Sequence, residues 1–145
     1  MTHVIAGDAE TLAAARELAA GFAAEAAARD AERPLPEPEL DRLSAGGLLA
    51  IPVPRAYGGA DVSARTLAEV FRLPAAADPN LAQIPHRHFV DVNVLRQQGT
   101  DVQREFFFGE VLDGGRFGNA QSEAGTKHVQ DYRTSLTAAP AGASC

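Results

Sequence analysis

The chain of 145 residues is 46% hydrophobic and 22% charged, and its formal net charge at pH 7 is -6. This composition is typical of a globular domain and excludes a collagen-like or disordered chain, while the lack of a basic block argues against nucleic-acid binding. The one cysteine is the last residue, Cys145, so no internal disulfide is possible, and no apolar run reaches the ~20 residues that span a bilayer. We therefore expect a soluble protein of the reducing cytoplasm with no membrane partner.

The first part of the chain predicts two helices separated by prolines. Apolar residues recur at spacings of three and four from Asp8, a candidate cap, to about Ala31. The prolines of RPLPEPEL cannot lie in a helix interior, because each lacks a donor and clashes with the preceding turn. A short second helix is expected to start near Pro36 or Glu37 and to stop at the glycine pair that begins with Gly46.

A loop and a third helix are predicted next. Residues 48–59, LLAIPVPRAYGG, hold two prolines and two glycines, which favours an irregular loop on the surface. Ser63 is a candidate cap for a helix whose apolar residues again recur at three and four. Pro74 falls inside this pattern, and an interior proline costs about 3 kcal/mol or more. We therefore expect a break or kink between Leu73 and Ala76.

Two further helices follow in the prediction. Asp78 and Pro79 form a start signal, an N-cap followed by proline at the first helical position. This helix is expected to continue to Gly99 with a kink at Pro85. Thr100 can cap the last helix, DVQREFFFGEVLDGG, which stops at its glycine pair. The run of phenylalanines in this helix is expected to pack in the core.

The sequence pattern changes after these glycines. RFGNAQSE and HVQDYRTSLT alternate and are rich in Thr, Ser, Val and Tyr, which predicts two strands. The final AAPAGASC has only small residues and no periodicity, so it has no means of burying apolar area. The expected fold class is therefore mainly α. It comprises a helical domain over residues 1–115, the first strands of an incomplete β-domain over 116–137, and a disordered tail over 138–145.

Several motifs occur in the order typical of one enzyme family. They are AGGLL at residues 45–49, IPVPRAYGGA at 51–60, DPNLAQIP at 78–85 and GNAQSEAGTKH at 118–128. Together they resemble the amino-terminal part of the acyl-CoA dehydrogenase family, and in particular its sulfur-acquisition oxidoreductase branch, close to dibenzothiophene monooxygenase. The resemblance extends over residues 8–137, and both Pro74 and the tail depart from it.

This resemblance implies a function as well as a fold. Members of the family hold a flavin, FAD or FMN, among a helical domain, a middle β-domain and a carboxy-terminal helix bundle, and they form homo-oligomers. The branch implies a flavin monooxygenase that acts on a small organosulfur compound and receives reduced flavin from a separate reductase. The alternatives are an acyl-CoA dehydrogenase proper and an inactive remnant or helical interaction domain. The catalytic glutamate of the dehydrogenases lies beyond the matched motifs, so no general base is transferred to this sequence.

The resemblance also implies candidate site residues. Asn119, Gln121 and Ser122 match the strand that lies along the flavin, and amides and hydroxyls suit a ring edge that needs donors and acceptors. The alternative is that Asn119 and Ser122 only complete a turn or a strand end. His88 looks like a catalytic residue that faces the substrate and flavin pocket, where it could donate a proton or orient the substrate; otherwise it is an ordinary surface or interface histidine. On a helix His86 points about 200° away from it, so this pair predicts no metal site.

Overall fold

The computed structural model describes residues 2–120, 122–125, 127–128, 130–135 and 137. These residues form helices and no strand, which confirms the mainly α fold class. In chain order the elements are α1 (Asp8–Ala23), α2 (Ala26–Glu32), α3 (Glu37–Ala45), the short 3-10 helices η1 (Leu48–Ala50) and η2 (Arg55–Tyr57), α4 (Ala64–Ala77), α5 (Pro79–Gln83), α6 (His86–Gln98) and α7 (Asp101–Leu112).

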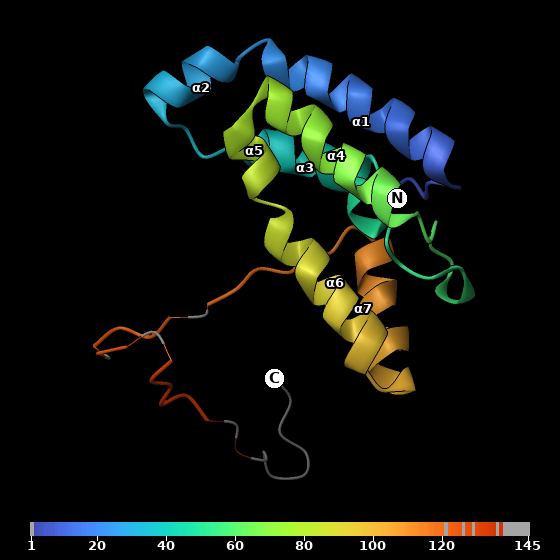
Figure 1. Cartoon of the computed structure of the whole chain (residues 1–145), viewed down its shortest axis with the longest axis vertical. Coiled ribbons are helices and arrows are strands. Elements are labelled where there is room, and N and C mark those ends of the chain that lie inside the picture. Colours follow the sequence, from blue (N-terminus) through green and yellow to red (C-terminus); the bar gives the residue numbers. More distant parts are fainter. Residues whose placement is uncertain (1, 121, 126, 129, 136, 138–145) are drawn as a thin grey trace.

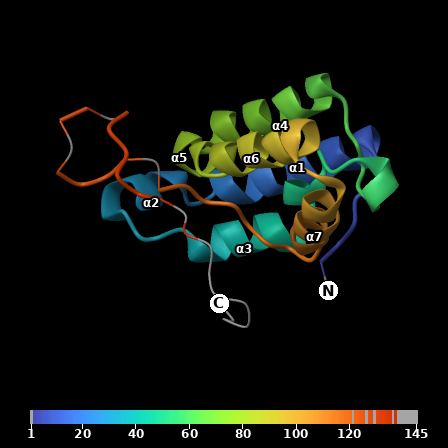
Figure 2. The ribbon, with the colours of Figure 1, turned by 90° about the horizontal axis from the view of Figure 1, so that it is seen from below.

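Two packed groups of helices make up the domain (Figure 1). α1 and α4 lie side by side, and α3 packs against α1. α6 and α7 form an antiparallel pair, because only Gly99 and Thr100 connect them, and this pair extends away from the α1 and α4 layer. Seen from below, α4, α1 and α3 form successive rows (Figure 2). The helical domain is thus a layer of long helices with a second helix pair attached at an angle.

The stretch LLAIPV, residues 48–53, lies at the centre of the core between these two groups. Leu48, Ile51 and Val53 are fully buried. Part of the stretch packs in a cluster with residues of α1, α3, α4 and α6, and the rest packs against α6 and α7, including Phe108. The prediction of a surface loop is therefore wrong for these residues. Prolines and glycines interrupt regular structure, but apolar side chains in an irregular segment still gain free energy by leaving water.

Three helix starts are set by local capping and are confirmed. The Ser63 hydroxyl and the Asp78 carboxylate each accept hydrogen bonds from backbone N–H groups of the helix that follows. Thr100 forms a capping box with Gln103, in which each side chain bonds the backbone of the other residue. The first N–H groups of a helix have no partner within it, so a side-chain oxygen at this position stabilises the start.

The first predicted helix, residues 8–31, is divided into α1 and α2 by a turn. Gly7 rather than Asp8 occupies the cap position of α1. The Asp8 carboxylate instead accepts a hydrogen bond of 3.2 Å from the Ser63 N–H. An alanine-rich sequence favours helix on both sides of the turn, so periodicity could not locate the division. The turn directs α2 so that Arg29 reaches α3 and α5.

The prolines at positions 74 and 85 act differently from the prediction. α4 continues through Pro74, so the break that the sequence allows there does not occur, and a kink at this residue stays a prediction. Pro74 lies in the last turn of α4, so the missing N–H removes one hydrogen bond near the helix end, and the Pro74 carbonyl accepts from the Asp78 N–H at 2.7 Å. Pro85 separates α5 from α6 instead of kinking one continuous helix.

The phenylalanine run of α7 is only partly in the core. Phe108 is fully buried and packs edge-on against Tyr57, with ring centroids 5.0 Å apart. Phe106 is 61% exposed, and Phe107 is partly buried. Successive residues on a helix point about 100° apart, so three consecutive side chains cannot share one face. The prediction of core packing is confirmed for Phe108 and wrong for Phe106.

The described residues beyond α7 form turns, bends and irregular backbone. The strands predicted between residues 116 and 137 are not found among them. Within this segment the Glu123 carboxylate accepts hydrogen bonds from the N–H groups of Arg133 and Thr134, at 2.8 and 2.7 Å. A two-stranded piece is marginal in water without further strands or a packing surface. The predicted tail, residues 138–145, lies outside the described residues.

Candidate functional site

His88 lies in the first turn of α6 and points into the protein, with 2% of its surface exposed. Its Nε2 lies 2.9 Å from the carbonyl oxygen of Leu49 in η1. Its Nδ1 accepts a hydrogen bond of 3.1 Å from the N–H of Phe117, just beyond α7. A nitrogen that accepts carries no hydrogen, so Nε2 must carry it and donate to the Leu49 carbonyl. These two bonds define one state, the neutral imidazole with its hydrogen on Nε2.

The surroundings of His88 favour this neutral state. Burial lowers the pKa of His88 below its ordinary value of 6.5, because the charged form loses its hydration. The hydrogen bond to the Leu49 carbonyl and the negative charge of Asp91 raise the pKa, and both effects are smaller. Asp91 is itself paired with Arg87, one turn earlier on α6, at 2.6 Å. His88 is therefore uncharged at neutral pH.

A mainly apolar pocket of about 250 Å³ lies beside the His88 imidazole. One side of it comes from α3, η1 and the turn between α5 and α6, with the side chains of Leu40, Leu43, Leu49, Ile84 and Pro85. Residues 116–119, the segment that follows α7, form the other side and include Asn119. The pocket thus lies between the helical core and the segment that leaves it.

Two arginines line this pocket, and each is paired with a carboxylate. Arg87 pairs with Asp91, and Arg116 pairs with Asp41 of α3 at 3.2 Å. The Arg116 side chain is 45% exposed and that of Asp41 is 69% exposed. The pocket therefore combines an apolar lining with two paired arginines, an arrangement suited to a mainly apolar ligand that carries some polar groups.

The structure brings together two of the candidate site residues predicted from the sequence. His88 and Asn119 line the same pocket, although they are 31 positions apart in the sequence. Ser122 is exposed and is not among the residues lining this pocket. Gln121 lies outside the described residues. The proximity of His88 and Asn119 agrees with a shared site, and the assignment of Gln121 and Ser122 stays a prediction.

Sequence reasoning missed Phe117 and the carbonyl of Leu49 as site components. The Phe117 ring stacks on His88, with centroids 5.7 Å apart and planes inclined by 27°. Phe117 directly precedes the GNAQS motif and Leu49 closes the AGGLL motif, so both were adjacent to a recognised signal. Neither residue type indicates a site by itself, because one contributes a backbone carbonyl and the other an N–H and an apolar ring.

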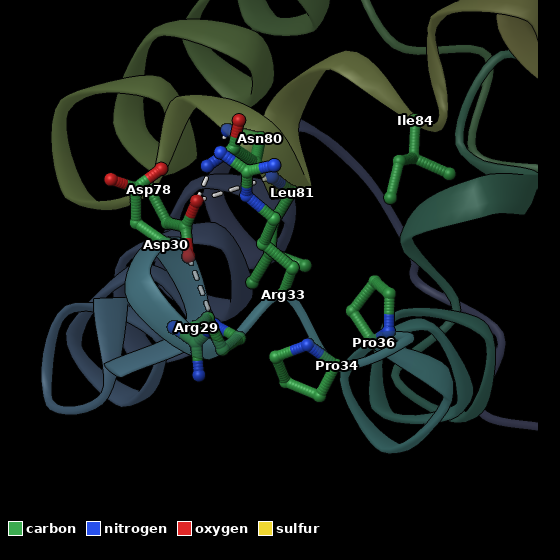
Figure 3. Close-up of a pocket in the computed structure, with 9 residues that line it drawn as sticks. All are labelled: Arg29, Asp30, Arg33, Pro34, Pro36, Asp78, Asn80, Leu81 and Ile84. Atoms are coloured by element: carbon green, nitrogen blue, oxygen red, sulfur yellow. Dashed lines mark hydrogen bonds and ion pairs between the residues drawn. The ribbon is translucent and has the colours of Figure 1, made fainter. Parts of the chain in front are cut away.

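A second pocket, of about 290 Å³, lies between α2 and α5 next to a buried ionic cluster (Figure 3). The Arg29 Nε donates to the Asp78 carboxylate at 2.9 Å, and the Arg29 guanidinium also bonds the Phe22 carbonyl. Glu39 lies 3.4 Å from the same guanidinium. All three charged side chains are at most 9% exposed. The cluster joins α2, α3 and the start of α5, which is a structural role.

Two structural features are absent from the described part of the chain. No group of three or more His, Cys, Asp or Glu side chains is placed there to hold a metal ion. None of the helices in these residues has the length and apolarity needed to cross a membrane.

The chain has the architecture expected of a helical amino-terminal domain of a flavoenzyme. It consists of a helical layer and an attached helix pair, and the motif-bearing residues lie at their junction. The family model for the acyl-CoA dehydrogenase N-terminal domain matches residues 8–115. The chain belongs to this family.

Comparison with individual proteins adds to this family assignment. The chain is 35% identical over 133 residues to a dibenzothiophene monooxygenase of Rhodococcus qingshengii, a match that covers 91% of the chain and 32% of the relative. It is 33% identical over 119 residues to a probable FMNH2-dependent monooxygenase, SfnC, of Pseudomonas putida, which covers 81% of the chain and 30% of that protein. The chain thus spans about a third of the length of the relatives it matches. No solved structure matches it.

Proposed function

We propose that this chain is the helical part of a flavin monooxygenase that oxidises a small organosulfur compound. The observation on which this rests is the pocket that His88 and Asn119 share at the junction of η1, α6 and the segment after α7. The names of the two kinds of relative described above are consistent with it, because both are monooxygenases. The family membership supports a flavin as the cofactor.

The residues present fit one part of a flavin. The apolar side chains of the pocket suit the face of a planar ring system, and the Asn119 amide offers both a donor and an acceptor to the ring edge. The same role is proposed for Gln121 and Ser122. When bound, reduced flavin supplies the activation of oxygen that the sulfur oxidation requires. In the proposed catalytic site the neutral His88 adds no charge of its own to the pocket and orients the bound molecules through the segment that it holds.

The finer features of the whole enzyme are part of the same proposal. FMN is favoured over FAD because one relative is named as FMNH2-dependent, and a separate flavin reductase would deliver it in reduced form. We place the enzyme in the cytoplasm and expect a homo-oligomer with no nucleic-acid or membrane partner. The helical domain would extend over residues 1–115 and the β-domain would begin at residue 116.

The second candidate function is the dehydrogenation of an acyl-CoA. The family match favours it, since the family model is named after acyl-CoA dehydrogenases. It ranks below monooxygenation because both kinds of named relative are monooxygenases. The two differ in their electron flow: a monooxygenase consumes oxygen with reduced flavin, whereas a dehydrogenase reduces its own flavin with the acyl-CoA.

Flavin binding to the full chain tests the proposal. Purified protein is titrated with oxidised FMN, reduced FMN and FAD while flavin fluorescence and the visible spectrum are followed. We expect micromolar binding, tightest for FMN, and a loss of about five- to tenfold in affinity for Asn119→Ala, the effect of one hydrogen bond. Asn93→Ala, an exposed position on α6, is the matched control and should bind like the natural chain. No binding of any flavin, or equal effects of the two variants, would contradict the proposal.

A further inference from the structure

The His88 imidazole connects two segments that are far from it in sequence. Leu49, which accepts from Nε2, is 39 positions away, and Phe117, which donates to Nδ1, is 29 positions away. The first bond ties α6 to the buried η1 segment, and the second ties α6 to the residues that follow α7. His88 thus links the buried core to the segment that carries Asn119.

The stacking of Phe117 reinforces this link. The Phe117 ring lies nearly parallel to the imidazole and also meets Phe107 of α7, with centroids 5.8 Å apart. The other anchor of this segment is the ion pair between Arg116 and Asp41, whose side chains are both largely exposed. Exposed ion pairs contribute little because water screens them and both side chains lose freedom. The bond to His88 joins the segment to a buried imidazole and is therefore the stronger constraint on the path of residues 116–119.

We infer that His88 is a positioning residue, which in its neutral Nε2–H form holds residues 116–119 against α6 and thereby keeps the Asn119 amide at the pocket. This inference deepens the proposed function and rests on it only for the identity of the ligand as a flavin. The role does not require His88 to exchange a proton with the bound molecules. Both ring nitrogens are already bonded within the protein, so neither is free to do so in this state.

Protonation would remove the second bond. A charged imidazole carries hydrogens on both nitrogens, so Nδ1–H would face the Phe117 N–H and two donors would oppose each other. On α6 the carboxylate of Asp91, which is paired with Arg87, favours the charged form. Arg116 lies on the opposite wall of the pocket, while α3, η1 and the turn before α6 present apolar side chains there. The burial that lowers the pKa of His88 thus protects the link at neutral pH.

The protonation state can be measured on the natural chain. Nitrogen-15 NMR of the labelled histidines distinguishes the two neutral tautomers from the charged ring. We expect His88 to show an unprotonated Nδ1 and a protonated Nε2, and to stay mainly neutral at pH 6.5, the ordinary histidine pKa. A hydrogen on Nδ1 at neutral pH, or a ring that is half charged or more at pH 6.5, would overturn the inference.

A matched pair of variants separates the two bonds of the ring. In His88→Asn the side-chain oxygen can take the place of Nδ1 and accept from Phe117, whereas in His88→Gln the amide group can take the place of Nε2 and donate to Leu49. We expect the Phe117 amide to keep its protection from hydrogen exchange in H88N and to exchange about tenfold faster or more in H88Q. The NMR signals of the Asn119 side-chain amide should shift in H88Q and stay near their natural positions in H88N.

Flavin binding then distinguishes this inference from the proposed function. If both hold, FMN binds the natural chain, and H88Q binds it more weakly than H88N. If the Phe117 and Asn119 signals respond as expected but no flavin binds, the positioning role stands and the proposed function fails. If FMN binds but exchange at Phe117 is the same in both variants, the positioning role fails. If either variant loses its helical circular dichroism signal, the nitrogen-15 spectrum of the natural chain still tests whether His88 is in the neutral Nε2–H form that the inference requires.

Discussion

Replacing Arg29 with methionine should remove the charge that joins α2, α3 and α5. The guanidinium of Arg29 pairs with Asp78 at 2.9 Å and lies 3.4 Å from Glu39, and the Asp78 and Glu39 side chains are 2% and 8% exposed. Methionine has a similar apolar stem but no donor, so the Arg29→Met variant leaves both carboxylates buried without this partner. The perturbation therefore tests the energetics of a buried charge cluster rather than a change in volume.

The expected loss is a large fraction of the total stability. Removing one partner of a buried ion pair costs about 3–5 kcal/mol, because the remaining charge stays away from water without compensation. Folded domains have a free energy of unfolding of about 5–15 kcal/mol. Asp78 keeps its bonds to the N–H groups of Asn80 and Leu81 and Glu39 keeps its pair with Arg42, so part of the cluster is retained and the lower end of this range is expected.

Urea unfolding followed by far-ultraviolet circular dichroism measures this effect directly. Arg72→Met is the matched control: Arg72 also pairs with a carboxylate, that of Glu69 at 2.8 Å, but its side chain is 62% exposed. We expect no resolvable change in the control, since water screens an exposed pair. If Arg29→Met and Arg72→Met unfold at the same urea concentration, the reasoning from burial is refuted.

Three further predictions follow from single positions. Pro74→Leu should raise the free energy of unfolding by up to about 3 kcal/mol, because α4 continues through this residue. The melting temperature should rise with it, and no gain would contradict a helical conformation there. Because the pKa of His88 is lowered on folding, the unfolded chain binds the proton first, so the free energy of unfolding should fall as pH drops below 6.5 and level off below the folded-state pKa. Urea titrations across this range should show that fall, and His88→Asn should reduce it. Gly47→Ala should lower the free energy of unfolding by at least about 1 kcal/mol, as a thermal melt would show. Gly47 has φ of 77°, and a Cβ there would lie 2.1 Å from the His3 carbonyl oxygen. Gly109→Ala on α7 is the control and should not be destabilising, because nothing lies within 4 Å of a Cβ at that position.

Local chemistry let the sequence predict most of the helices. Ser63, Asp78 and Thr100 were identified as caps because a side-chain oxygen bonds N–H groups only two or three residues away, and all three act so. The stop at Gly46 and Gly47 follows from the same kind of short-range preference. The family motifs added the fold class and the branch, which the matching family model and the named relatives support.

The effect of a proline depended on context that the sequence pattern does not contain. Pro74 and Pro85 both lie within periodic apolar sequence, yet α4 runs through the first and the chain is divided at the second. A proline inside a helix loses one hydrogen bond and clashes with the preceding turn, and the apolar pattern does not show how near the helix end the proline will lie. Position in the last turn made Pro74 tolerable.

Tertiary packing alone decided the site and the centre of the core. Residues 48–53 are buried because two groups of helices close around them, and a proline-rich pattern cannot reveal what will surround it. The sequence singled out His88 and Asn119 separately, by resemblance, but the bond between the imidazole and the Phe117 N–H joins residues 29 positions apart. Capping depends on atoms a few residues apart and can be read from the chain, whereas a hydrogen bond between distant segments exists only once the whole domain has packed.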